Sequence, residues 1–207
     1  MPFFSDNLKM FIDRVNYTNT YLLVDDKEAI VIDPALNEHK VNEALRGTNI
    51  KLIGIILTHG HYDHIGNTFI LAKQWDVPVY VHKKEKDVIQ KGHLAEMLNM
   101  KPNIDEGIIR YFNDTTLEVG RFHFDVILTP GHTPGSICLK YHNYLFTGDT
   151  IFPDSIGRTD LPYGDANAME RSLKLMIANW QDEWMIFPGH GNVGLGKDIK
   201  RSNNFLH

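Results

Sequence analysis

The stretch that decides the fold is residues 58–64, Thr58-His59-Gly60-His61-Tyr62-Asp63-His64. It brings three imidazoles and one carboxylate into six consecutive positions, and both groups are good ligands for divalent zinc, iron or manganese. In an extended segment His59, His61 and Asp63 would share one face, and His64 would point elsewhere. Four such donors favour two neighbouring metal ions. The alternative, a polar turn with solvated histidines, is the usual explanation for a histidine that stands alone.

Three further motifs carry single donors. His132 lies in Pro-Gly-His-Thr-Pro-Gly at residues 130–135, Asp149 ends Thr-Gly-Asp at 147–149, and His190 lies in Pro-Gly-His-Gly at 188–191. Taken singly, these are equally well explained as a tight turn, a helix N-cap and a loop histidine. However, all four groups directly follow expected strands, and ligands at the ends of several strands converge on one rim of a sheet. The sequence therefore predicts one shared site.

The hydrophobic pattern predicts an α/β fold, because the middle of the chain alternates strand, helix and strand. Expected strands cover residues 8–12, 20–24, 29–34, 50–57, 77–81, 116–119, 122–128, 136–141, 144–147 and 184–187. Expected helices cover 39–46, 65–75 and 166–180, the stretch 83–99 is charged and helix-prone, and 100–111 is expected to be a loop. With no repeat, linker or composition break, we expect residues 1–207 to form a single domain.

Composition narrows the class of protein. A net charge of −5 argues against nucleic acid as a partner. No apolar stretch of about 18 residues suggests a membrane span, and residues 1–10 lack the basic and apolar regions of a signal peptide. Cys138 is the only cysteine, so no intramolecular disulfide can form, which suits a reducing cytosol. We therefore expect a cytoplasmic protein in which Cys138 is a small buried residue and not a nucleophile.

The donors in their order resemble the five-motif signature of the metallo-β-lactamase superfamily: His-x-His-x-Asp-His at 59–64, then Gly-His-Thr, Gly-Asp and Gly-His. The resemblance covers nearly the whole chain. It implies a four-layer αββα sandwich of two similar halves, with the site along one edge of the two sheets. It also implies the ligand sets: one metal held by His59, His61 and His132, a second held by Asp63, His64 and His190, and Asp149 bridging the two.

Further residues indicate which branch of the superfamily this chain resembles. His61 stands where the flavodiiron branch has a glutamate, and secreted β-lactamases carry a signal peptide and a different ligand in place of Asp149. Residues 148–160 and the tail at 200–206, Lys-Arg-Ser-Asn-Asn-Phe-Leu, resemble the short hydroxyacylglutathione hydrolases, or type II glyoxalases. Longer members add a helical domain that grips glutathione and carry a lysine and a tyrosine where this chain has Arg158 and Asp160. These two residues are candidates for substrate binding, with an exposed ion pair as the alternative.

The function that this resemblance implies is hydrolysis of a small acyl-thiol ester such as S-lactoylglutathione. The resemblance implies two divalent ions, with zinc as the expected metal and iron or manganese as alternatives. Such ions would lower the pKa of a shared water from 15.7 to about 7. The resulting hydroxide would attack the thioester carbonyl, with Asp63 orienting it as the catalytic residue. The rival function is a persulfide dioxygenase, which also shares the 148–160 motif, with one iron on His59, His132 and Asp149. A non-catalytic scaffold is disfavoured because no ligand position is degraded. The oligomeric state is left open.

Overall fold

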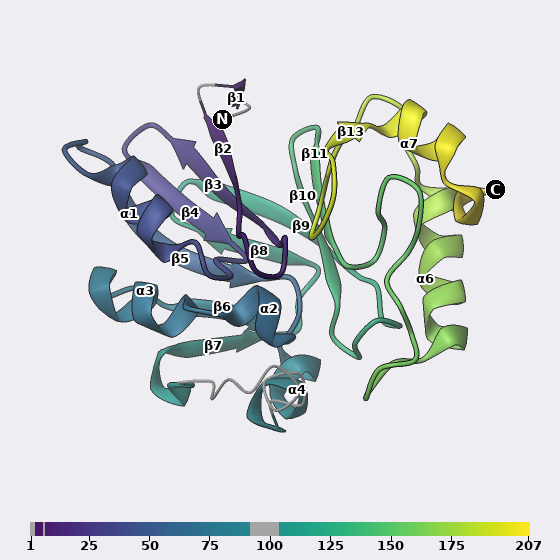
Figure 1. Ribbon diagram of the computed structural model, residues 1–207, viewed down its shortest axis with the longest axis horizontal. Coiled ribbons are helices and arrows are strands. Elements are labelled where there is room, and N and C mark those ends of the chain that lie inside the picture. The colour runs from purple at the N-terminus through teal and green to yellow at the C-terminus, as the bar shows by residue number, and fades with distance from the viewer. Residues whose placement is uncertain (1–2, 6, 92–103) are drawn as a thin grey trace.

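Two β-sheets pack face to face, and helices cover the outer face of each (Figure 1). The computed structural model describes residues 3–5, 7–91 and 104–207. The first sheet contains seven strands in sequence order: β1 (Phe3–Ser5), β2 (Leu8–Ile12), β3 (Asn19–Asp25), β4 (Glu28–Ile32), β5 (Lys51–Leu57), β6 (Val79–His82) and β7 (Ile109–Phe112). Strands β1 to β4 pair antiparallel, and β4 to β7 pair parallel. The helical connections between the parallel strands must therefore cross one face of the sheet.

The second sheet contains six strands, in the spatial order β13 (Gly194–Leu195), β12 (Met185–Pro188), β11 (Tyr144–Gly148), β10 (Ile137–Tyr141), β9 (Phe122–Leu128) and β8 (Thr116–Val119). Strands β11 and β12 pair parallel, and the other neighbours pair antiparallel. The pattern of β9 alternates buried and exposed positions along Phe122 to Val126. This alternation is typical of a strand with one face on the core and one face in water.

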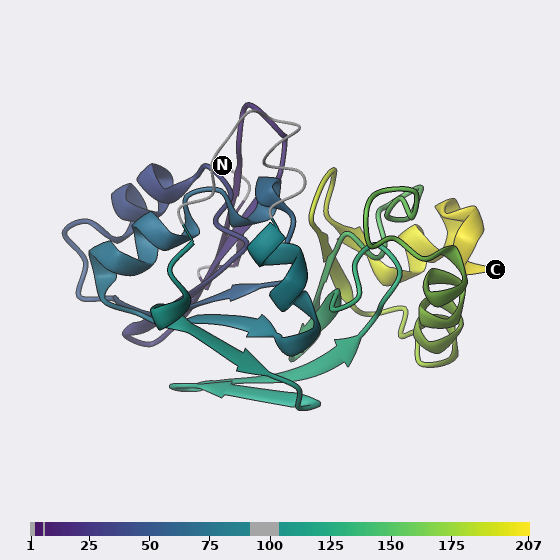
Figure 2. The same cartoon turned by 90° about the horizontal axis from the view of Figure 1, so that it is seen from below.

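The helices fall into two groups that lie on opposite sides of the molecule (Figure 2). One group belongs to the first sheet: α1 (Glu38–Leu45), α2 (Tyr62–Ile65), α3 (Thr68–Trp75), α4 (Lys86–Lys91) and the 3-10 turns η1 (Lys83–Glu85) and η2 (Glu106–Ile108). The other belongs to the second sheet: α6 (Ala166–Ala178), α7 (Gly196–Ser202) and the 3-10 turn η3 (Asn204–Leu206). Among the helices of the described residues, none has the length and apolar character needed to cross a bilayer.

Three apolar cores separate the four layers. The first lies between the helices and the first sheet and includes Val41 and Leu71. The second lies between the sheets, where the rings of Tyr21, Phe146 and Phe187 meet with centroids 5.1 to 5.5 Å apart. The third lies under α6 and α7. Helix, sheet, sheet and helix thus follow one another, which confirms the αββα sandwich.

Two local expectations are wrong. The helix expected over 65–75 is broken: α2 ends before Gly66, which has φ of +37°, and α3 starts at Thr68. A Cβ at Gly66 would overlap the backbone of Ala35, so the break comes from packing against a distant loop. The loop expected over 100–111 contains η2 and most of β7, an edge strand that the hydrophobic pattern marks weakly. The remainder of that loop and of the helix-prone stretch, residues 92–103, lies outside the described residues.

Candidate metal centre

The seven predicted donors meet at one end of the two sheets. The segment 58–64 follows β5, His132 follows β9, Asp149 follows β11 and His190 follows β12. Backbone hydrogen bonds hold these loops together across the two sheets: Ile137 N–H donates to the Thr58 carbonyl at 3.0 Å, and Asn19 N–H donates to the Gly189 carbonyl at 2.7 Å. Helix α2 lies where the two halves of the molecule meet (Figure 1). The convergence expected from strand ends is therefore present.

The donors form overlapping clusters whose candidate ligand atoms lie within 4.8 Å of one another. One cluster contains His59, His61 and His132, a second contains Asp63, His64 and His190, and a third contains His59, His64 and Asp149. The first two clusters match the ligand sets implied by the family resemblance. Within them, His61 Nδ1 lies 2.8 Å from His132 Nε2, and His64 Nε2 lies 3.3 Å from His190 Nε2.

The position of Asp63 differs from the sequence-based expectation. We expected Asp63 to share a face with His59 and His61, as it would in an extended segment. Instead, His61 is the last extended residue and Asp63 lies in the turn of α2. The turn carries the carboxylate to the other cluster, where Asp63 Oδ2 is 3.2 Å from His190 Nε2. The start of a helix within the motif thus separates the two clusters.

Asp149 lies between the two clusters. Its Oδ1 is 3.2 Å from His64 Nε2, and its Oδ2 is 3.4 Å from His132 Nε2 and 3.6 Å from His190 Nε2. One carboxylate oxygen therefore faces the second cluster alone, while the other faces both. This position suits a bridging ligand.

Hydrogen bonds at the back of three histidine rings set their orientation. His132 Nδ1 lies 2.8 Å from the Arg158 carbonyl oxygen, and His190 Nδ1 lies 3.3 Å from that of Tyr17. His64 Nδ1 lies 2.8 Å from Asp33 Oδ2. A carbonyl or carboxylate acceptor fixes the proton on Nδ1, so that the Nε2 lone pair is turned into the site.

Three buried atoms of the site have no hydrogen-bond partner, namely His59 Nε2, Asp63 Oδ1 and Asp149 Oδ1. An unpaired buried polar atom costs about 1–3 kcal/mol, and in a native protein it calls for an explanation such as a bound ion. Imidazole nitrogen and carboxylate oxygen are both ligands of divalent transition metals. The residues present therefore fit two divalent ions.

The direction of the pKa shifts differs between the histidines of the two clusters. Burial lowers the pKa of His61 to about 3, and burial also holds the pKa of His59 well below its usual value, so both rings are neutral at physiological pH. Burial lowers the pKa of His64 as well, but the carboxylates of Asp149 and Asp33 outweigh it and raise this pKa well above its ordinary value. Burial raises the pKa of Asp63, but His64 and the hydrogen bond with His190 outweigh burial and hold this pKa below the usual range. The second cluster is thus the more polar one.

A cavity of about 350 Å³ opens onto the site. It is lined by His61, Asp63, His132, Asp149, Phe152, Ile156, Arg158, Leu161 and His190. Arg158 thus stands beside the candidate ligands, whereas Asp160 is not among the lining residues. The two side chains form an exposed bidentate ion pair. Arg158 Nε lies 2.7 Å from Asp160 Oδ1, and Arg158 Nη2 lies 2.8 Å from Asp160 Oδ2. The exposed ion pair is therefore present, and a role of these residues in substrate binding stays a prediction.

Sequence reasoning missed two buried carboxylates that support the ligand loops. Asp33 accepts hydrogen bonds from the N–H and the hydroxyl of Thr58, at 2.8 and 2.6 Å. Glu85 accepts from the N–H of Gly60 at 2.6 Å and from that of Gly135 at 2.5 Å. Asp33 directly follows β4, so the strand-end rule that found the ligands also applied to it. Glu85 lies in a charged stretch and carried no comparable signal.

The lone cysteine and two histidines outside the donor motifs have structural or surface contacts. Cys138 is fully buried in β10, 3.7 Å from Thr129 Oγ1, which confirms its expected role. His82 accepts from the N–H of Lys84, and His123 pairs with Glu118 at the surface. His93 lies outside the described residues.

The metallo-beta-lactamase superfamily model matches residues 13–190. The chain belongs to the metallo-β-lactamase superfamily. Among curated relatives, it is 34% identical to the hydroxyacylglutathione hydrolase GloC of Haemophilus influenzae, over 88% of this chain and 89% of that one. It is 33% identical to the probable metallo-hydrolase YqgX of Bacillus subtilis, over 84% of each chain.

Solved structures show the same relationship. The BLEG-1 B3 metallo-beta-lactamase superposes with a TM-score of 0.87 and 30% identity, covering 96% of this chain and 99% of that one. TTHA1623 in a di-iron-bound form superposes with a TM-score of 0.84 and 28% identity, covering 95% and 99%. The relatives thus include proteins named as hydrolases and one that binds iron.

Proposed function

We propose that this chain hydrolyses small acyl-thiol esters such as S-lactoylglutathione at a centre of two divalent metal ions. Zinc is the metal that we propose for both positions. One observation carries the proposal: Asp149 lies between two ligand clusters and lines a cavity of about 350 Å³. The substrate class is supported by the likeness to GloC, which is named as a hydroxyacylglutathione hydrolase. When bound, two such ions supply Lewis acidity and a water whose pKa falls from 15.7 to about 7.

Asp63 has the position of the residue that orients the attacking water. It lines the cavity, and its Oδ2 is 3.2 Å from His190 Nε2, while its buried Oδ1 has no partner. Because its pKa is held below the usual range, the carboxylate is ionised at neutral pH. An ionised carboxylate that lines the cavity can accept a hydrogen bond from a water there and align that water toward a carbonyl carbon.

Arg158 has the position of a substrate-binding residue. Its side chain lines the cavity, while its carbonyl oxygen accepts from His132 Nδ1. A carboxylate on the thiol part of the substrate would compete with Asp160 for the same planar guanidinium. Since a thiolate is a good leaving group, the chain needs no strong general acid at this site.

The test is release of free thiol from S-lactoylglutathione by protein stripped of metal and reloaded with zinc, iron or manganese. We expect turnover only after reloading, and none from His59→Ala. His123→Ala, an exposed histidine remote from the site, serves as the matched control. A β-lactam is included as a comparison substrate because of the likeness to BLEG-1. Metal-loaded protein that leaves every thioester intact refutes the proposal.

A persulfide dioxygenase is the second candidate; the similar TTHA1623, known in a di-iron-bound form, supports iron as a metal for such a site, although with two ions. In that case one iron would use His59, His132 and Asp149, and the remaining donors would be dispensable. Oxygen consumption by the iron-loaded protein with glutathione persulfide, without thioester hydrolysis, would favour this function over the hydrolase.

A further inference from the structure

One loop connects the candidate metal centre with one side of its cavity. It spans residues 150–157, directly after Asp149, and we call it the wall loop. Its side chains Phe152 and Ile156 line the cavity that opens onto the metal centre, which we call the metal cavity. The ring of Phe152 has its centroid 6.1 Å from that of His190. Because both loop side chains are apolar, the wall loop places an apolar surface beside the polar donors.

Contacts close to the metal ligands fix the two ends of the wall loop. Its first residue follows Asp149, and its last precedes Arg158, whose carbonyl oxygen lies 2.8 Å from His132 Nδ1. A Cβ at Gly157 would overlap the carbonyl oxygen of Asp149, so the two ends of the loop lie against each other. The ends are therefore set by the ligand residues themselves, and the tip between them needs a separate support.

The C-terminal tail supports the tip of the wall loop. Asn203 is fully buried, and its Nδ2 donates to the carbonyl oxygens of Phe152 and Ser155, both at 2.8 Å. The neighbouring Ser202 donates from Oγ to the carbonyl oxygen of Pro153 at 2.8 Å. Three carbonyl groups of the loop thus accept hydrogen bonds from two successive side chains of the tail.

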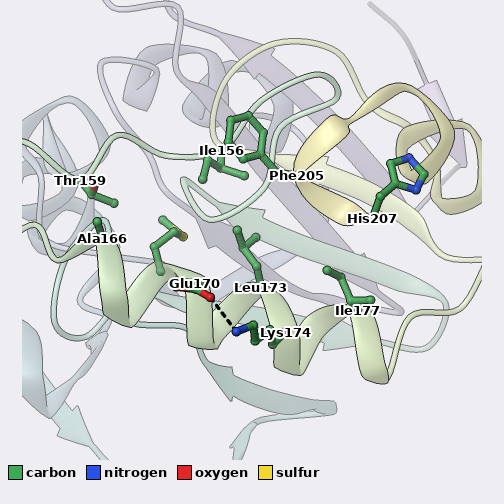
Figure 3. A pocket seen from close by; sticks show the side chains of 10 residues that line it. Ile156, Thr159, Ala166, Glu170, Leu173, Lys174, Ile177, Phe205 and His207 are labelled. Carbon is green, nitrogen blue, oxygen red and sulfur yellow. Dashed lines mark hydrogen bonds and ion pairs between the residues drawn. The ribbon is translucent and has the colours of Figure 1, made fainter.

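An asparagine suits this position because its amide carries two N–H donors and one acceptor oxygen. Both donors of Asn203 go to the wall loop, and its Oδ1 accepts from the N–H of Phe205 at 2.9 Å. An ionised aspartate of the same shape would keep the acceptor and lose both donors. Figure 3 shows that Phe205 of the tail and Ile156 of the loop also line one cavity under α6.

We propose that Asn203 is a positioning residue for substrate binding, which holds Phe152 in place as part of the apolar wall of the metal cavity. This inference rests on the proposed thioester hydrolysis. The wall lies beside the metal donors and not among them, so its displacement should weaken substrate binding and spare the metal ions. A substrate that covers part of a phenyl ring gains about fivefold in affinity. We therefore expect Phe152→Ala to raise KM about fivefold.

A double-mutant cycle separates positioning from general destabilisation. KM and kcat for S-lactoylglutathione are measured with the metal-loaded native protein, Asn203→Asp, Phe152→Ala and the double variant. We expect Asn203→Asp to raise KM about fivefold with kcat nearly unchanged, and the double variant to match Phe152→Ala alone. Asn204→Asp, at the next and exposed position of the tail, is the matched control and should change neither constant. An additive effect in the double variant, or an unchanged KM in Asn203→Asp, overturns the inference.

Hydrogen exchange of the wall loop supplies a measurement that needs no substrate. The N–H of Phe152 donates to the Ser155 carbonyl at 2.9 Å, so release of the tip should expose this amide. By mass spectrometry of the metal-loaded protein, we expect Asn203→Asp to speed exchange of residues 150–157 about tenfold, the factor that one hydrogen bond supplies, and Asn204→Asp to leave it unchanged. Faster exchange without hydrolysis of any thioester refutes the proposed function and retains Asn203 as the support of the loop. Native exchange in Asn203→Asp refutes the support itself.

A milder variant covers the case in which Asn203→Asp does not fold. Ser202→Ala removes the hydrogen bond to Pro153 from an exposed position of the tail. We expect it to speed exchange of the wall loop and to raise KM in the same direction, by a smaller factor. Native values of both quantities in Ser202→Ala would count against a support of the loop by the tail.

Discussion

Glu85 connects two of the loops that carry the candidate ligands, and its replacement should weaken the metal centre without touching a ligand. The side chain is fully buried. One oxygen accepts from Gly60, between His59 and His61, and the other accepts from Gly135, in the loop of His132. A Cβ at either glycine would come within 2.8 Å of the carboxylate oxygens, so the fit is tight on both sides.

The magnitude follows from these two bonds. Hydrogen bonds to a charged acceptor contribute about 1.5–3 kcal/mol each, and a buried N–H left without a partner costs about 1–3 kcal/mol. Glu85→Gln keeps the shape of the side chain but turns one acceptor into a donor that faces an N–H. We therefore expect a loss of about 2–4 kcal/mol in the free energy of unfolding. Residues that orient ligands from behind typically change metal affinity by about 10–100-fold, and we expect a loss in that range.

Two measurements check this prediction: urea unfolding of the metal-free protein, and metal affinity by competition with a chelating dye. Glu118→Gln, an exposed glutamate on β8, should change neither. If Glu85→Gln unfolds earlier yet binds metal as tightly as the native protein, the carboxylate stabilises the fold without positioning the ligands. If neither quantity changes, the two hydrogen bonds do not have the strength argued above.

Asp149→Ala should release both ions more readily than His190→Ala does, because Asp149 faces both clusters; equal retention of metal by the two variants would remove its bridging role. Burial raises the pKa of the Cys138 thiol to about 11. Native Cys138 should therefore resist alkylation at about pH 8, and rapid native labelling in a mass spectrum would contradict this. Because the folded pKa lies above the unfolded one, stability should fall as pH rises toward 11, and less so in Cys138→Ala, as urea midpoints would show. Arg158→Ala should raise KM more than Asp160→Ala does, with little change in Tm because their ion pair is exposed; a large fall in Tm with unchanged KM would make Arg158 structural.

The sequence predicted which side chains converge because each is encoded locally. His132, Asp149 and His190 each follow a strand whose hydrophobic pattern is clear, and a strand end fixes where the next side chain lies. The layer order followed from the family resemblance of these same motifs. What local pattern could not predict was the turn of α2, which moves Asp63 to the second cluster. That turn ends at Gly66 because the backbone of Ala35, which is distant in sequence, lies against it.

Asp33 and Glu85 were not predicted for the same reason, because their contacts with the ligand loop join residues that are distant in sequence. Asp33 and Glu85 act on the ligand loop from 25 residues before and after it, and no periodicity connects such positions. Their value to the site is visible only in three dimensions. They hold the N–H groups of Thr58 and Gly60, on either side of His59, and so fix the backbone that presents this ligand.

The buried carboxylates also bear on how many ions the site holds. A buried carboxylate costs several kcal/mol unless it is paired, and this end of the molecule contains three, Asp33, Glu85 and Asp149, beside the partly buried Asp63. Backbone N–H groups and a hydroxyl compensate Glu85 and part of Asp33, but the oxygen Oδ1 of Asp63 has no partner. The carboxylates that remain for metal are Asp63 and Asp149, which belong to different ligand clusters. Each has one buried oxygen without a hydrogen-bond partner, a placement that fits two ions better than one.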